Sequence, residues 1–371
     1  MHTFALGHAA CADWQEAARR CLAQIGDAPR ANLGFLYVTD HFAGDLEAIL
    51  SYLKDETGVE EWVGSVGIGI CATGREYFDE PALAAMLATF PAQNFRVFSG
   101  IEHDLEELGP DCAQWAEHAT ASLAVVHADP SNSKTPLLVE ALAQALPAGF
   151  LVGGITSSRH GHRQVANVVT HGGLSGVLFA AEQGVVTGLT QGCCLMGQKH
   201  QISEARGQVL ARLDGRPALE VFNEEVGDIL ASDPQRAAGY IFAALPIHGS
   251  DTGDYLVRNI IGIDPEKNLL AVSDQLEVGE ALQFCRRDVR TAQEDLLRML
   301  RDVKRRCPKP PRGGVYYSCV GRGRNMFGER SEELLTIQQE LGDFPLVGFF
   351  ANGEISHDRL YGYTGVLTVF V

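Results

Sequence analysis

Two short segments near the C-terminus combine side chains that could do chemistry. The segment SCVGR (318–322) ends an apolar run with a thiol, a glycine and a guanidinium. The segment NGE (352–354) follows the apolar run LVGFFA and places a carboxylate in a glycine turn. A carboxylate and a guanidinium beside glycine-rich backbone suit a zwitterionic ligand, because arginine binds carboxylates bidentately and glycine permits close approach. The elements that position these segments decide whether the two groups meet.

Both segments belong to a pattern that occurs three times: an apolar strand, an amphipathic helix, and a Val-Gly pair that opens a second strand. The predicted strand, helix and strand are 33–38, 45–56 and 62–70 in the first copy, 122–128, 135–146 and 151–158 in the second, and 314–320, 329–341 and 346–355 in the third. A strand–helix–strand segment of about 30 residues is a βαβ unit, which has parallel strands and a right-handed crossover. Internal duplication and chance similarity among α/β segments both explain the pattern.

The repeated units predict an α/β fold with repeated βαβ units and mixed sheets, in two domains that share a ligand crevice. Ligands of open parallel sheets bind outside the carboxyl ends of the strands, and the strands predicted here end in small or polar residues. Between the βαβ units, short apolar runs alternate with glycine over 171–209, and a similar pattern covers 240–279. These runs favour antiparallel strands.

The two strands of one βαβ unit end at the same edge of a sheet. We therefore expect Glu354 to face a crevice that Cys319 and Arg322 also line. The alternative is that Glu354 only pairs with Arg322 and fixes the C-terminal turn. Gly353 follows an asparagine after a buried strand, so we expect it to adopt a backbone conformation closed to other residues.

A long, locally basic helix is predicted over 285–306, and the prolines at 308, 310 and 311 end it. A solvated helix face is the ordinary interpretation of its charges. The alternative is a docking surface for an acidic partner.

Composition limits the class of protein. The chain has 371 residues, 46% hydrophobic and 21% charged, with a net charge of −17 and a pI near 5.1. Such an acidic chain repels phosphate backbones and anionic lipids, so neither nucleic acid nor a membrane is an expected partner. No apolar run is long enough to span a bilayer and the N-terminus lacks a signal peptide. Nine scattered cysteines indicate reduced thiols, and together these features predict a cytoplasmic protein.

The motifs of several common enzyme and metal sites do not fit. Gly321-Arg322-Gly323-Arg324 lacks the spacing and the lysine of a phosphate-binding loop. His160 and His162 stand two residues apart with no other metal ligands in the pattern, so no metal site is predicted. Cys193-Cys194 lacks the spacing of a redox pair. Cys319 lies beside cationic residues, which lower a thiol pKa, but no residue is nominated as its base, so a core or ligand-contact role is favoured over a nucleophile.

Longer motifs resemble the FIST family, a two-part bacterial sensory domain, over nearly the whole chain. The N-terminal part is similar in LGFLYVTDHFAGDLEAIL (33–50), LVGGITSSR (151–159) and LDGRPA (213–218). The C-terminal part is similar in DYLVRNIIGID (254–264), YYSCVGRGRNMFGERSEE (316–333) and PLVGFFANGEIS (345–356). The resemblance implies an N-terminal domain over 1–219 and a C-terminal domain over 220–371.

The resemblance also implies a signal-input module that binds a small ligand, with amino acids as the proposed class. It supplies no catalytic residues. No F-box, kinase, cyclase or methyl-acceptor region is attached, so the output is expected from a separate partner. The matched positions expected to line the ligand site are Arg258, Cys319, Arg322, Asn352, Gly353, Glu354 and Thr364.

Four functions remain open at this point. The first is a small-molecule sensor in which Glu354 binds a ligand ammonium and Arg258 or Arg322 binds its carboxylate. The second is a haem protein with His127 or His248 as axial ligand, because some relatives resemble haem-binding nitric-oxide sensors. The third is an enzyme that acts through Cys319, and the fourth is a protein-interaction scaffold. The identity of any cofactor stays unknown.

Overall fold

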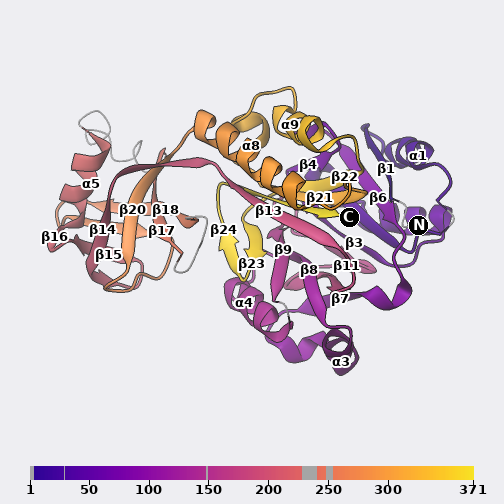
Figure 1. The fold of residues 1–371 in the computed structure, drawn as a ribbon, viewed down its shortest axis with the longest axis horizontal. Helices are drawn as coiled ribbons and strands as arrows, with labels where there is room; N and C mark the ends of the chain where they lie inside the picture. The colour runs from indigo at the N-terminus through magenta and orange to yellow at the C-terminus, as the bar shows by residue number, and fades with distance from the viewer. Residues whose placement is uncertain (1–3, 29, 148, 228–239, 248–253) are drawn as a thin grey trace. The chain divides into compact units, whose positions relative to one another are not determined.

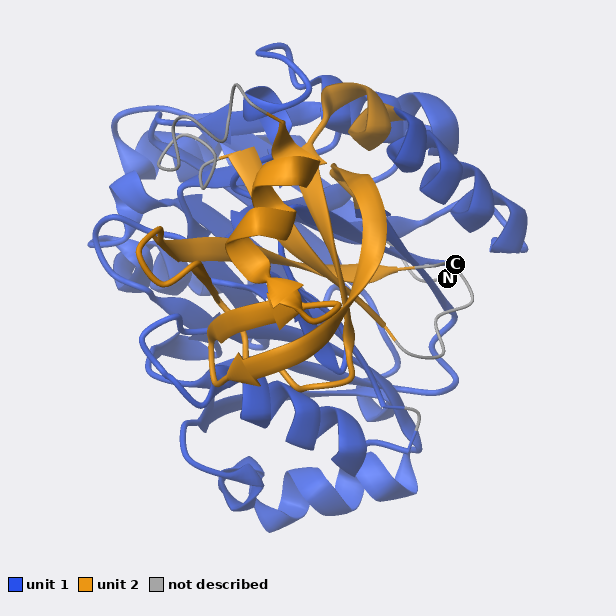
Figure 2. Ribbon diagram, turned by 90° about the vertical axis from the view of Figure 1, so that its left-hand side faces the viewer, with its two compact units in different colours: residues 1–190, 294–371 blue, residues 191–293 orange. Residues whose placement is uncertain are grey.

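The chain folds into two compact units, which Figure 2 shows in different colours and whose helices and strands are labelled in Figure 1. The computed structural model describes residues 4–28, 30–147, 149–227, 240–247 and 254–371. Unit 1 comprises Met1–Thr190 and Glu294–Val371, and unit 2 comprises Gln191–Gln293. Unit 2 is thus an insertion in the chain of unit 1. The domain boundary near residue 219, which divides the chain by its sequence motifs, stays a prediction.

Unit 1 consists of three modules with the same order of elements. Module 1 contains β1 (Phe4–Ala10), α1 (Trp14–Ile25), β2 (Leu33–Thr39), α2 (Leu46–Thr57), β3 (Trp62–Gly67), β4 (Gly69–Ala72), β5 (Arg75–Phe78) and β6 (Ala82–Ala88). Module 2 contains β7 (Phe95–Ile101), α3 (Pro110–His118), β8 (Ala121–Ala128), α4 (Thr135–Ala145), β9 (Phe150–Ile155), β10 (Gln164–Ala166), β11 (Val168–Thr170) and β12 (Leu174–Ala180). Module 3 contains β13 (Val185–Gln191), α8 (Val289–Arg306), β21 (Gly313–Cys319), α9 (Glu332–Leu341), β22 (Leu346–Ala351), β23 (Glu354–His357), β24 (Arg359–Tyr361) and β25 (Thr364–Phe370), with unit 2 between β13 and α8. Short 3-10 turns cover Asp40–Phe42, Ala92–Asn94, Leu105–Leu108 and Gly323–Asn325.

Each module builds its sheet in the same way. The strands of the three predicted βαβ units pair in parallel, as β2 with β3, β8 with β9, and β21 with β22. The last strand of each module lies antiparallel to the first strand of its own parallel pair. The three resulting orders are β1-β6-β2-β3-β10-β11, β7-β12-β8-β9-β23-β24 and β13-β25-β21-β22-β4-β5. The α/β class with repeated βαβ units and mixed sheets is therefore confirmed.

The modules exchange their hairpins in a cycle. The hairpin β4–β5 of module 1 joins the sheet of module 3, where β4 pairs with β22. The hairpin β10–β11 of module 2 joins module 1, and the hairpin β23–β24 of module 3 joins module 2. Each sheet is consequently completed by another module, which ties the three modules into one unit.

The Val-Gly glycines explain why the sequence pattern repeats. Gly64, Gly153 and Gly348 lie opposite Leu36, Val126 and Tyr316 of the neighbouring parallel strands. At each glycine an added Cβ would overlap the carbonyl oxygen of that opposite residue. Only glycine fits such a close approach of two backbones. The same steric constraint at the same register in three modules supports duplication over chance similarity.

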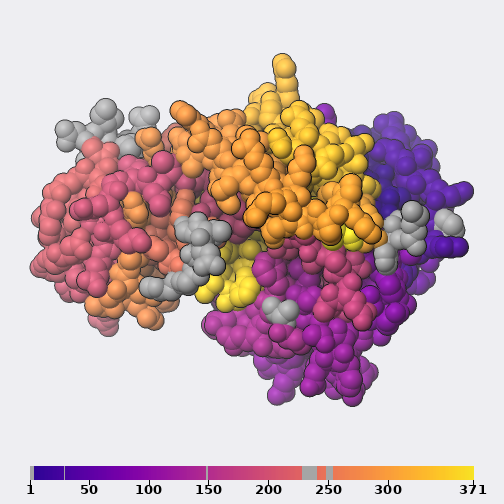
Figure 3. All heavy atoms as spheres, in the orientation of Figure 1, coloured from indigo at the N-terminus to yellow at the C-terminus, as the bar shows by residue number. Residues whose placement is uncertain are grey.

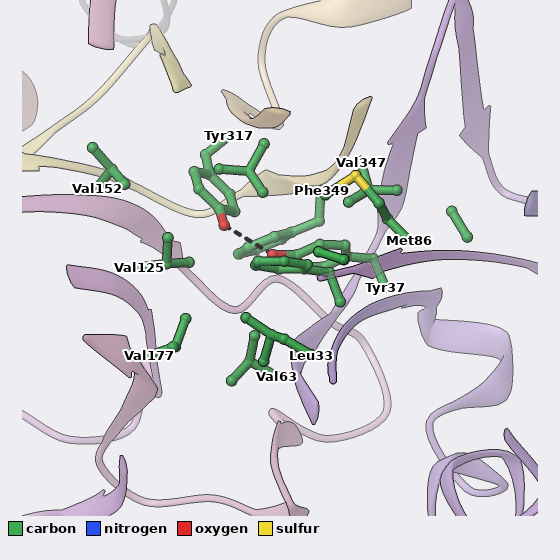
Figure 4. Close-up of a cluster of buried hydrophobic side chains, with 14 of the residues drawn as sticks. Leu33, Tyr37, Val63, Met86, Val125, Val152, Val177, Tyr317, Val347 and Phe349 are labelled. Atoms are coloured by element: carbon green, nitrogen blue, oxygen red, sulfur yellow. Dashed lines mark hydrogen bonds between the residues drawn. The ribbon is translucent and has the colours of Figure 1, made fainter. Parts of the chain in front are cut away.

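Equivalent positions of the modules also meet in the core of unit 1, and Figure 4 shows two of them, Tyr37 and Tyr317, joined by a hydrogen bond. Tyr37, His127 and Tyr317 each follow the residue that lies opposite the Val-Gly glycine. The Tyr37 hydroxyl lies 2.8 Å from the Tyr317 hydroxyl and 3.0 Å from His127 Nε2. All three side chains are fully buried among apolar residues, so the core joins the modules through one shared hydrogen-bonded group.

Helix α8 begins at Val289, not at residue 285 as predicted. Residues up to Arg287 extend strand β20, because Phe284 and Cys285 are buried in a sheet. The apolar side of α8 buries Leu296, Met299, Leu300 and Val303. Its other side exposes basic residues such as Arg301 and Arg305, and the helix lies at the surface in Figure 3, in orange.

In its described residues, unit 2 is an antiparallel sheet with the short helix α5. Its elements are β14 (Cys193–Arg206), β15 (Val209–Leu213), β16 (Arg216–Pro217), α5 (Ala218–Val226), β17 (Ile241–Pro246), β18 (Tyr255–Asp264), β19 (Leu269–Val272) and β20 (Ala281–Arg287). The sheet closes on itself, because β14 pairs with both β20 and β15. The antiparallel strands predicted for 240–279 are confirmed. Over the described parts of both units, no helix has the length and hydropathy needed to cross a membrane.

Candidate functional site

The two chemically promising segments meet at one edge of the module 3 sheet. Cys319, the last residue of β21, lies opposite Ala351, the last residue of β22. The amide of Val320 donates a hydrogen bond to the Ala351 carbonyl at 3.0 Å. The carboxyl ends of the parallel pair therefore bring residues 319–322 and 352–354 together, as the βαβ pattern predicts.

Glu354 is fully buried at the start of β23. Its Oε2 atom accepts hydrogen bonds from the Thr364 amide at 3.0 Å and the Thr364 hydroxyl at 2.7 Å. Its Oε1 atom has no hydrogen-bond partner among the residues that the structure describes. Burial raises the pKa of Glu354 to about 8, although the bonds from Thr364 and the charge of Arg322 act in the opposite direction. The side chain is therefore mostly protonated at neutral pH.

Arg322 is also fully buried, and it pairs with Glu333 of α9. Its Nε and Nη2 atoms donate to Glu333 Oε1 at 2.9 and 2.7 Å. The same carboxylate accepts bonds from the Tyr316 hydroxyl at 2.7 Å and the Gly323 amide at 2.9 Å. Arg322 Nη1 has no partner in the described part of the chain. The alternative in which Glu354 pairs with Arg322 is wrong, because Glu333 takes that place.

A second buried carboxyl group lies on the hairpin that module 1 contributes to this sheet. Glu76 of β5 is 7% exposed, and neither of its oxygens has a partner among the described residues by hydrogen-bond geometry. Burial and the nearby Glu333 carboxylate raise the pKa of Glu76 to about 8, against the weaker effect of nearby backbone amides. The buried cluster thus holds Glu76, Arg322, Glu333 and Glu354, of which Arg322 and Glu333 form the ion pair.

Cys319 lies close enough to Glu354 for the carboxyl group to affect its pKa, but its thiol is not activated. It is 8% exposed, and the Gly321 and Tyr363 amides lie within hydrogen-bonding reach of its sulfur. Burial and the Glu354 carboxyl raise the pKa of the Cys319 thiol more than Arg322 lowers it. Arg322 lowers this pKa as a cationic neighbour is expected to, but burial and Glu354 outweigh it, so the pKa of the thiol is raised overall.

The remaining C-terminal candidates lie around the same turn. Gly353 has φ +148°, and an added Cβ would lie 3.1 Å from the side chain of Ile155, so the prediction of a glycine-specific conformation is confirmed. Asn352 is exposed, and its amide donates to the Ile155 carbonyl at 2.9 Å. Thr364 begins β25 and binds Glu354 directly.

Two further candidates among the described residues lie away from this edge. Arg258 belongs to unit 2, where its Nε atom donates to Asp274 Oδ2 at 2.5 Å, and its role toward a ligand stays a prediction. His127 lies in the core of unit 1, where Tyr37, Tyr317 and Phe349 enclose its ring. Burial lowers the pKa of His127 to about 3, so the ring is neutral. His248 lies outside the described residues.

Sequence reasoning missed both Glu333 and Glu76. A signal for Glu333 exists, because it precedes Ile337 and Leu341 by four and eight residues and so shares the apolar face of the helix. A carboxylate on such a face needs a buried partner. Glu76 gives no comparable signal, since its strand joins the sheet of a different module. Within the described ranges, no group of three or more His, Cys, Asp or Glu residues is arranged to hold a metal ion.

Two family models and several relatives match this chain over most of its length. The family model of the FIST N domain matches residues 32–216, and that of the FIST C domain matches residues 218–357. An uncharacterized protein of Mycobacterium tuberculosis is 33% identical over 341 residues, which cover 83% of this chain and 83% of the relative. An uncharacterized protein of Mycobacterium bovis is 29% identical over 365 residues, which cover 93% of this chain and 92% of the relative.

Proposed function

Because the chain belongs to the FIST family, whose domains are sensory domains of signal transduction, we propose that it is a cytosolic signal-input protein for an amino-acid-like ligand. The ligand binds in unit 1 where β21 and β22 end, and the signal passes to a separate output protein. Nine free cysteines without a disulfide fit a reducing compartment.

One observation carries the choice of ligand. The buried cluster contains an acceptor, Glu354 Oε1, and a donor, Arg322 Nη1, that the described residues leave without hydrogen bonds. Buried polar atoms are nearly always hydrogen-bonded, and each exception calls for a partner. A zwitterion matches both atoms, since its ammonium donates to Glu354 and its carboxylate accepts from Arg322. Arg258 is the alternative carboxylate partner.

Ligand entry requires the covering turn to move, because Arg322 and Glu354 are 0% exposed. Tyr363 lies over this edge, with ring atoms 3.4 Å from where a side chain on Gly321 would begin. Its backbone has φ +60°, a strained conformation for a tyrosine. A strained turn over buried polar groups is a suitable gate, because opening it releases strain while ligand contacts offset the lost packing.

The other functions have less support. His127 is poorly placed to bind haem, because Nε2 bonds to Tyr37 and three aromatic rings pack around the imidazole in the core, although Nδ1 has no hydrogen-bond partner among the described residues. Cys319 has a raised thiol pKa and lies next to a carboxyl group that is itself mostly protonated, so it lacks the features of a nucleophile. A protein-interaction scaffold would not need the unpartnered polar atoms of a buried cluster.

Thermal unfolding tests the proposal. The standard amino acids are each added to the protein beside the corresponding N-acetyl amino acid and amino-acid amide, with haem as a separate addition. Binding to the native state raises the melting temperature. We expect at least one amino acid to raise it and both blocked forms to lose most of the effect. Stabilisation by haem alone, or by none of these compounds, contradicts the proposal.

The variant Arg258→Gln separates the two candidate carboxylate partners. If Arg322 binds the carboxylate, the shift that an amino acid produces is unchanged in Arg258→Gln. If the shift disappears while the ligand-free variant melts like the wild type, Arg258 binds the carboxylate and the assignment to Arg322 is wrong.

A further inference from the structure

The threefold arrangement of unit 1 provides internal counterparts of Glu354. The residue after each Val-Gly glycine pairs with the first strand of an exchanged hairpin. Ser65 lies opposite Gln164, Gly154 lies opposite Glu354, and Phe349 lies opposite Ile70. Gln164, Glu354 and Ile70 therefore occupy the same position in the three sheets, and all three are buried.

At Gln164, the equivalent position in the second module, both polar atoms of the side chain bond within the protein. Its Oε1 atom accepts a hydrogen bond from Ser175, and its Nε2 atom donates to the Gly173 carbonyl at 3.1 Å. Gly173 corresponds to Thr364, because Leu174 and Gly365 lie opposite the equivalent residues Ala128 and Ser318. Both side chains thus fasten a hairpin to the start of the last strand of their module. Holding the hairpin to that strand requires a side chain with the shape of Gln or Glu, and Gln164 does so without a charge.

Glu354 differs from this counterpart in two ways. Both polar atoms of Gln164 have partners, whereas Glu354 Oε1 has none among the described residues. Glu354 is also the only one of the three equivalent residues that can ionise. Attachment of the hairpin explains why Oε2 accepts two hydrogen bonds from Thr364. It does not explain why Oε1 has no partner among the described residues, or why this position has a carboxyl group where the second module has an amide.

From this comparison we infer that Glu354 determines the charge selectivity of the ligand site, exchanging its own proton for a cationic amine of the ligand. The inference rests on the proposed function and adds the proton exchange by which the site selects a ligand ammonium. The exchange is balanced: the ammonium donates a hydrogen bond to the ionised Oε1, and the carboxyl proton leaves to solvent. No covalent bond of the ligand changes.

The surroundings of Glu354 set the charge that fits. Arg322 and Glu333 face it as an ion pair and nearly cancel each other. Cys319 faces it as a neutral thiol, since its pKa is raised, and Thr364 contributes only hydrogen-bond donors. Gly154 and Tyr361 pair with its backbone on either side. One ionised carboxylate is therefore balanced by one positive charge, so the site selects an amine with a single positive charge at the bound end.

Proton release is the direct readout. Each standard amino acid that raises the melting temperature is titrated calorimetrically in two buffers of different ionisation enthalpy, at a pH below the Glu354 pKa. We expect the wild type to release about one proton for each amino acid bound, since Glu354 starts mostly protonated and ends ionised. Release close to zero overturns the inference without use of any variant.

The variant Glu354→Gln reproduces the native residue of the second module. We expect it to fold like the wild type, to release no proton, and to lose affinity for the amino acid about tenfold or more, as expected when a charged hydrogen bond is removed. The variant Glu117→Gln, at an exposed position, is the matched control, and it should release as many protons for each amino acid bound as the wild type. Unchanged proton release and amine preference in Glu354→Gln overturn the inference while leaving the proposed function intact.

A failure of the proposed function is distinguishable. If no amino acid binds, methylammonium replaces the amino acids as the smallest cationic amine. The inference then requires that methylammonium raises the melting temperature of the wild type and not that of Glu354→Gln. Equal responses, or none in the wild type, overturn it.

Discussion

Replacing Glu354 by Gln should change how the stability of the ligand-free protein depends on pH. The carboxyl group is buried, and its pKa is raised from 4.5 to about 8 in the folded protein. A raised folded pKa stabilises the protein fully below the unfolded pKa, and this contribution is lost as the pH rises through the folded pKa. One pKa unit corresponds to about 1.4 kcal/mol, so the loss between about pH 5 and about pH 8 amounts to about 3 kcal/mol. Glu354→Gln has no proton to lose and should not show this loss.

Urea unfolding followed by circular dichroism at several pH values measures the effect. The free energy of unfolding of Glu354→Gln, minus that of the wild type, should increase by about 3 kcal/mol between about pH 5 and about pH 8. Glu76 titrates in the same direction, but it is present in both proteins and cancels in the difference. Glu117→Gln controls for the loss of one carboxyl group at the surface. A flat difference for Glu354→Gln would show that Glu354 is ionised in the folded protein, and would refute the reasoning.

Three further predictions concern packing, a buried ion pair and the exposure of two thiols. Gly348→Ala should destabilise the fold by more than about 2 kcal/mol, because the added Cβ overlaps the Tyr316 carbonyl. Gly44→Ala, at an exposed glycine with open space around it, is the control and should be near neutral. Equal melting temperatures of the two variants would contradict this prediction. Glu333→Gln should cost about 3–5 kcal/mol in urea unfolding by leaving Arg322 buried without a counter-charge, and a loss below about 1 kcal/mol would show that Arg322 finds another partner. Iodoacetamide should label the less buried Cys194 in the native protein long before Cys319, as followed by peptide mass spectrometry, and early labelling of Cys319 would contradict its burial and raised pKa.

Sequence patterns alone predict the local part of this fold well. Apolar periodicity finds each strand and helix of the three βαβ units, and the Val-Gly pairs mark the positions where parallel backbones approach most closely. The same patterns place Cys319 and Glu354 at one edge, because parallel strands end together. The start of α8 is misplaced, since the residues that end β20 have the composition of a helix. Helix α9 begins three residues later than predicted, and the second strand of each βαβ unit ends three or four residues earlier.

What the sequence does not predict depends on contacts between modules. The exchange of hairpins brings Glu76 into the sheet of module 3 from a position more than two hundred residues away, and no local signal encodes that pairing. The partner of Arg322 is missed for a related reason. Glu333 and Glu354 are equally plausible along the chain, and only the packing of α9 against β21 chooses between them. Arg258 resembles a site residue in sequence, but in the fold Asp274 already pairs with it.

A crystal structure of the complex tests the central claim most directly, with the amino acid that raises the melting temperature most. The account predicts its ammonium within hydrogen-bonding distance of Glu354 Oε1, its carboxylate at Arg322 Nη1, and the turn at Tyr363 moved from its ligand-free position. An amino acid bound away from this edge, with Glu354 and Arg322 unchanged, would contradict it.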